Sequence, residues 1–171
     1  MFVDGTNPTV KELFEKAIEI ENRAEEFYRI LADIFSHYDK VSNFWNSLAA
    51  DEVMHSKTLQ NIYKSIPEQK LVSLPDEKIY ESVNMIYNFV QKDMISGINN
   101  LDDAYEAAHE FEFSEINAIF KILVTEFIQV DERRKFIVSE IMNHQKKLVD
   151  FSKNFGDRKW RREVLVRRSK P

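Results

Sequence analysis

A glutamate and a histidine interrupt an otherwise apolar helical face near residue 50 of this chain. Glu52 and His55 lie one helical turn apart, within a face whose other members are Val41, Trp45, Leu48, Leu59, Ile62 and Ile66. A carboxylate on a buried face is costly unless it is paired, hydrogen-bonded or bound to metal. Glu-x-x-His on one helix face is also how helical bundles build internal di-metal sites. If these two residues bind metal, other helices should supply further ligands.

The composition and the spacing of apolar residues predict an all-α protein. The chain has 171 residues, of which only 3 are Gly and 4 are Pro. Apolar residues recur at helical spacing over about residues 8–37, 39–66, 100–126 and 131–156. A crossover between the second and third segments carries apolar positions from Ile79 to Met94, which predict an extra helix. We therefore expect a four-helix bundle of two antiparallel hairpins joined by a long crossover.

Helix start signals accompany all four segments. Asn7 or Thr9 can cap the first helix, Asp39 the second, Asn99 or Asn100 the third and Asp131 the last. The first helix is expected to end near His37.

Polar residues occupy the apolar stripes of the other long helices as well. Glu21 lies in the first stripe, Glu112 and Glu115 in the third, and His144 in the last. The segment around His144 aligns with the one around His55, since Asn143-His144-Gln-Lys-Lys-Leu148 matches Met54-His55-Ser-Lys-Thr-Leu59. This weak internal repeat of about 50 residues suggests that each half of the bundle supplies ligands to one central site.

In order along the chain, these motifs resemble those of the rubrerythrin branch of the ferritin-like superfamily. The resemblance covers roughly residues 8–152 and rests on Ala17-Ile-Glu-Ile-Glu21-Asn-Arg-Ala24-Glu-Glu-Phe27-Tyr28, Asp51-Glu52-Val-Met-His55, Glu112-Phe-Ser-Glu115 and His144. It implies a ferritin-like bundle that binds two iron ions. It further implies peroxide reduction or oxidation of ferrous iron by oxygen, a chemistry suited to carboxylate and imidazole ligands.

The resemblance also implies a role for each polar stripe residue. Glu21 and Glu112 match terminal ligands, and Glu52 matches a bridging ligand. His55 and His144 match the histidines beside the two metals. Glu115 matches a third-helix carboxylate that can change its coordination with redox state in rubrerythrins.

Two departures from the family pattern affect these expectations. Ile141 stands where the fourth helix should carry a second bridging glutamate, so the second metal site is expected to be weaker unless Glu115, Glu140 or His109 compensates. Cysteine is absent, so the chain cannot hold the four-cysteine iron centre of full-length rubrerythrins, and electrons must come from a separate donor.

The overall charge and hydropathy limit the expected partners and location of the protein. The net charge is −5, although residues 158–170 carry seven Lys or Arg against one Glu, so the body is acidic and nucleic acid is not an expected partner. There is no apolar run long enough for a membrane span and no signal-peptide pattern, which predicts a cytoplasmic protein. We expect a homodimer with a bundle at 1–156 and a basic extension at 157–171, either flexible, docked or packed on a partner. The alternative function is a degenerate member with one metal or none, acting as a structural or interaction module in which Glu52 and His55 form a core polar pair.

Overall fold

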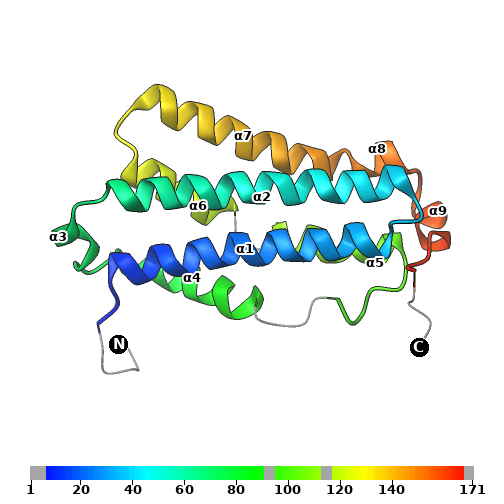
Figure 1. The fold of residues 1–171 in the computed structure, drawn as a ribbon, viewed down its shortest axis with the longest axis horizontal. Helices are drawn as coiled ribbons and strands as arrows, with labels where there is room; N and C mark the ends of the chain where they lie inside the picture. Colours follow the sequence, from blue (N-terminus) through cyan, green and yellow to red (C-terminus); the bar gives the residue numbers. More distant parts are fainter. Residues whose placement is uncertain (1–6, 91–94, 113–116, 168–171) are drawn as a thin grey trace.

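The computed structural model describes residues 7–90, 95–112 and 117–167, which are mainly helical (Figure 1). Helices α1 (Val10–Ile34) and α2 (Asp39–Ser65) form one long antiparallel hairpin. The second half of the bundle contains α5 (Leu101–Phe111), α6 (Asn117–Phe127) and α7 (Asp131–Val149). A single long helix was expected as the third of the bundle, but α5 and α6 follow each other along the bundle in its place (Figure 1). α7 returns antiparallel to them (Figure 1).

The crossover between the two halves contains a short helix and a longer one. These are α3 (Glu68–Leu71) and α4 (Glu77–Val90), and α4 packs along the first half of α1. The extra helix predicted from the apolar positions after Pro75 is therefore present. The structure confirms the expected all-α bundle of two antiparallel hairpins with a helix-containing crossover.

Local sequence explains where the helices begin, with two corrections. The Thr9 hydroxyl accepts a hydrogen bond from the Glu12 amide at 3.2 Å, so Thr9 is the cap of α1. Asp39 and Asp131 are first-turn residues rather than caps. From the first turn, their negative charges interact favourably with the positive N-terminal end of the helix dipole. α1 ends at Ile34, earlier than expected, because the residues that follow must form the turn into α2.

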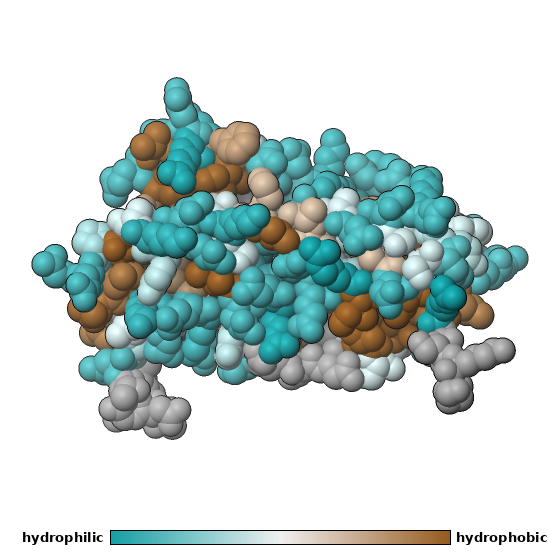
Figure 2. Space-filling view, viewed as in Figure 1, coloured by the Kyte–Doolittle hydropathy of each residue, from teal (hydrophilic) through white to brown (hydrophobic). Residues whose placement is uncertain are grey.

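The apolar core has two parts, separated by a polar layer. One cluster combines the first half of α1 and the second half of α2 with α4 and α6. The other combines the opposite halves of α1 and α2 with α5, the end of α7 and α8 (Phe151–Phe155). The predicted ligand residues lie where these clusters meet. The exposed face in Figure 2 is mostly hydrophilic, and none of the described helices is long and apolar enough to cross a membrane.

The basic C-terminal segment docks on the bundle as far as the structure describes it. Within it, α9 (Arg158–Glu163) places the buried Arg161 guanidinium 3.0 Å from the buried Asp102 carboxylate of α5. Backbone hydrogen bonds from Leu101 to Val164 and from Arg167 to Ile34 tie the segment to both halves of the bundle. The segment thus closes one end of the bundle, and Gly156 allows the chain to enter it with a φ of 74°.

Candidate metal centre

The structure brings five of the six predicted ligands together in the polar layer of the bundle. They come from all four long segments and are only 1–6% exposed: Glu21 on α1, Glu52 and His55 on α2, Glu112 after α5, and His144 on α7. Glu115 lies outside the described residues. Helical periodicity explains the convergence, because each residue occupies an apolar stripe that faces the bundle interior.

The five side chains form two three-residue groups that share one carboxylate. Glu21, Glu52 and His55 make one group, and Glu52, Glu112 and His144 make the other. Within each group, one ligand atom per residue lies within 4.8 Å of the others. The two Glu52 oxygens face different histidines, with Oε2 at 2.8 Å from His55 Nδ1 and Oε1 at 3.2 Å from His144 Nε2. Glu52 is therefore the one residue common to both groups, with a different oxygen atom directed at each histidine.

His55 sits between two carboxylates of the first hairpin. Its Nδ1 atom lies 2.8 Å from Glu52 Oε2 and 3.5 Å from Glu21 Oε2. Burial alone would lower the pKa of His55, but its hydrogen bonds with Glu21 and Glu52 raise that pKa to about 10. Without metal, His55 therefore carries a positive charge that neutralises part of the acidic layer.

His144 repeats this arrangement on the other side of Glu52. Its Nε2 atom lies 2.9 Å from Glu112 Oε1, and its Nδ1 atom lies 3.0 Å from Asp51 Oδ2. Burial would lower the pKa of His144, yet the charges of Glu52 and Glu112 raise it to about 11. The two histidines are thus related both in sequence and in electrostatic role.

Glu52 holds a proton more tightly than an ordinary glutamate. Burial raises its pKa to about 8, and the charge of Glu112 acts in the same direction. Carboxylates that crowd together in a core repel one another and should retain a proton when no metal is bound, and the raised pKa of Glu52 agrees with this in direction. Desolvation is the larger cause, however, ahead of the mutual repulsion on which that expectation was based.

Three residues outside the predicted set support the ligands. Asp51 accepts from Lys147 Nζ at 2.5 Å as well as contacting His144, and this carboxylate orients the imidazole. Tyr28 is fully buried and donates its hydroxyl to Glu112 Oε1 at 2.5 Å. Neither Asp51 nor Lys147 was assigned a role from the sequence. Asp51 immediately precedes Glu52 and therefore lies outside the apolar stripe of α2. Its role becomes visible only through its contacts with His144 and Lys147 on α7.

The residues considered as substitutes for a second bridge occupy less favourable positions. His109 is exposed on α5, and Glu140 is half-buried on α7. The side chain of Ile141 is not described. From the described residues alone, both groups contain two carboxylates and one histidine, so the expected difference in strength between the sites depends on Ile141.

The donor set fits divalent metal. Metal–oxygen and metal–nitrogen bonds of ~2.0–2.2 Å place neighbouring ligand atoms about 2.8–3.6 Å apart for bond angles of roughly 90–109°, a range that includes the spacings around the two histidines. Two buried ligand atoms, Glu21 Oε2 and His144 Nε2, also have no hydrogen-bond partner among the described residues. Both atoms nevertheless lie within ion-pair distance of a neighbour, with Glu21 Oε2 at 3.5 Å from His55 Nδ1 and His144 Nε2 at 2.9 Å from Glu112 Oε1. A bound cation would replace the imidazole protons at these contacts.

Comparison with known proteins gives one result. The Rubrerythrin family model matches residues 12–137, which include every predicted ligand except His144. No curated protein and no solved structure matches significantly. Since the family match spans most of the 171 residues and the fold agrees with it, the chain belongs to the rubrerythrin family.

Proposed function

We propose that this protein binds iron at two adjacent positions inside the bundle and either oxidises ferrous iron or reduces peroxide there. Glu21, Glu52 and His55 would hold one ion, and Glu52, Glu112 and His144 the other. The observation that carries the proposal is the pair of buried triads that share Glu52. Oxygen and imidazole ligands suit iron, and bound iron would supply the redox chemistry.

Side chains around the ligands would hold the ligand groups in position when iron binds or changes its charge. Asp51 holds the His144 ring through Nδ1, leaving Nε2 directed at Glu52 and Glu112. Tyr28 fixes Glu112 with a short hydrogen bond, and burial raises the pKa of Tyr28 well above its usual value, so the hydroxyl stays protonated. The apolar clusters on both sides exclude water from the ligand layer.

One observation favours the metal-free structural alternative. The raised pKa values of His55, about 10, and His144, about 11, place an imidazolium ion between each pair of carboxylates. Because Glu52, with a pKa of about 8, keeps its proton at neutral pH, the two imidazolium ions balance the charges of Glu21 and Glu112 without metal. In this alternative the layer would specify helix pairing, and the protein would act as an interaction module.

Anaerobic titration of metal-free protein with ferrous iron separates the two candidates. The iron proposal expects saturable binding and consumption of oxygen or peroxide by the loaded protein. Iron binding requires proton release from the two imidazoles, so protons should appear in solution as iron binds. Absence of specific iron binding would reject the proposal and favour the structural alternative.

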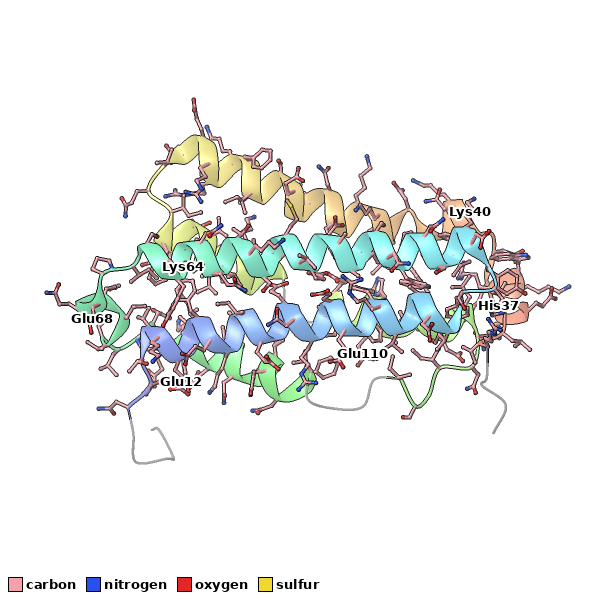
Figure 3. All side chains as sticks on the ribbon, viewed as in Figure 1. Glu12, His37, Lys40, Lys64, Glu68 and Glu110 are labelled. Carbon is pink, nitrogen blue, oxygen red and sulfur yellow. The ribbon has the colours of Figure 1, made fainter. Side chains whose placement is uncertain are left out.

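Two neighbouring glutamates provide a matched pair of variants. Glu112→Gln changes a buried ligand, whereas Glu110→Gln makes the same change at an exposed position on α5, labelled in Figure 3. We expect Glu112→Gln to lower iron affinity by at least ~10-fold, the smaller effect reported for altered supporting residues. Glu110→Gln should bind iron like the unaltered protein. Equal losses in both variants would mean that iron binds to surface acids.

A further inference from the structure

A run of aromatic rings in contact, stacked at its inner end and tilted further out, leads from the candidate metal centre to one end of the bundle. The Tyr28 and Trp45 rings are nearly parallel, with centroids 6.0 Å apart and planes 11° apart. Trp45 lies 5.3 Å from Phe151, which lies 4.7 Å from Phe155. Each spacing is within the range of direct ring contact. The run crosses from α1 through α2 to α8.

The inner end of this run touches a candidate ligand. Tyr28 is 0% exposed, and its hydroxyl donates to Glu112 Oε1 at 2.5 Å. A phenol in this position can lose an electron while its proton moves a short distance to a carboxylate oxygen. Tyr28 therefore couples the ligand layer to the rings behind it.

The middle of the run contains an unusual indole. Trp45 is 0% exposed, yet its Nε1 has no hydrogen-bond partner among the described residues. A buried polar group without a partner costs free energy, and a redox role is one reason for such a group to occur. Tryptophan and tyrosine are the side chains in this run that lose an electron most readily, so Trp45 is the natural second member of a relay.

The outer end of the run lies just beneath the surface, where Phe155 is 4% exposed. Phe155 lines an open pocket of about 430 Å³ together with Tyr38 and Trp160, which are 38% and 41% exposed. The Lys40 ammonium lies 5.4 Å from the Phe155 ring centroid. Lys40 is labelled in Figure 3 at the end of the bundle opposite Glu68. A reductant in solution can therefore approach the last ring without entering the core.

We propose that Tyr28 and Trp45 relay electrons from the surface at Phe155 to the metal centre, an inference that rests on the iron-dependent function proposed above. Tyr28 would supply one electron to the centre while peroxide or oxygen is being reduced there, and its proton would move to Glu112. Trp45 then reduces Tyr28, which recovers its proton from Glu112. A one-electron reductant such as ascorbate in the pocket at Phe155 replaces the electron of Trp45 by tunnelling across Phe151 and Phe155, whose rings are not themselves oxidised. The net change is one electron transferred from reductant to iron, with both relay residues restored.

Trp45→Phe tests the relay because it keeps a ring in the stack but removes the readily oxidised indole. Iron-loaded protein is treated with peroxide and frozen for electron paramagnetic resonance, and ascorbate reduction of the oxidised iron is timed separately. We expect a longer-lived tyrosyl radical in Trp45→Phe and about tenfold slower reduction by ascorbate. Tyr63→Phe, at a half-buried tyrosine in the other core cluster, is the matched control and should change neither. An unchanged radical lifetime and reduction rate in Trp45→Phe would overturn the relay.

A metal-free experiment keeps this result separate from the proposed iron chemistry. A ruthenium photo-oxidant with persulfate is too bulky to touch the fully buried Trp45. Peptide mass spectrometry should nevertheless find oxidised Trp45, because an oxidant at the pocket can draw an electron from Trp45 by tunnelling across the phenylalanine rings. Phe44 and Phe151 both lie between Trp45 and Phe155, so the double variant Phe44→Leu with Phe151→Leu should reduce this product severalfold. If Trp45 remains unoxidised while Trp160 is oxidised, the relay is wrong. If Trp45 is oxidised but ferrous iron is neither bound nor oxidised, the relay stands and the iron function fails.

Discussion

Tyr28→Phe should weaken both the fold and the metal centre by removing one hydroxyl. The Tyr28 hydroxyl is fully buried and donates to Glu112 Oε1 at 2.5 Å. Hydrogen bonds to charged groups contribute about 1.5–3 kcal/mol. Glu112 retains His144 Nε2 at 2.9 Å, so we expect a loss near the middle of that range, about 2 kcal/mol. For a chain of this length, such a loss lowers the melting temperature by roughly 4–8 °C.

Chemical and thermal unfolding of metal-free protein measures the first effect. Iron titration measures the second, for which the loss of a group that orients a ligand predicts ~10–100-fold weaker affinity. Tyr63→Phe is the control, since it removes a hydroxyl from the other core cluster and leaves the ligand layer intact. The reasoning is refuted if Tyr28→Phe matches the unaltered protein in both melting temperature and iron affinity, because Glu112 would then not depend on Tyr28.

Three other perturbations have defined outcomes. The pKa values of His55 and His144 are raised to about 10 and about 11, above the ordinary value of ~6.5. The two histidines therefore stabilise the folded state fully below about pH 6.5. This stabilisation is lost as the pH rises through the folded-state pKa values. Urea titrations of metal-free protein should therefore show a falling free energy of unfolding between about pH 7 and 11, with a shallower fall in His144→Gln. Arg161→Ala leaves the buried Asp102 with weaker pairing and should cost about 3 kcal/mol in urea unfolding at neutral pH; a change below 1 kcal/mol would show that α9 docking is dispensable. Ile141→Glu should increase bound iron per chain by metal analysis, whereas two irons already bound to the unaltered chain would show that no bridge is missing.

The sequence identified the ligand faces because helical periodicity is a local property. Glu21, Glu52, His55, Glu112 and His144 each interrupt an apolar stripe, and an apolar stripe must face a core. The paucity of Gly and Pro likewise predicted the four long helical segments and the crossover helix. Glu115 lies outside the described residues, so its role stays a prediction.

Only the tertiary structure showed which side chains meet across helices. Asp51 contacts His144 and Lys147 on α7, Tyr28 contacts Glu112, and Asp102 pairs with the arginines of the C-terminal segment. These pairs join residues far apart in the chain, so no local spacing encodes them. The capping corrections at α2 and α7 have a similar origin, because turn geometry depends on where the neighbouring helix packs. Periodicity decides which face of a helix is buried, but relative helix position decides which buried groups form a site.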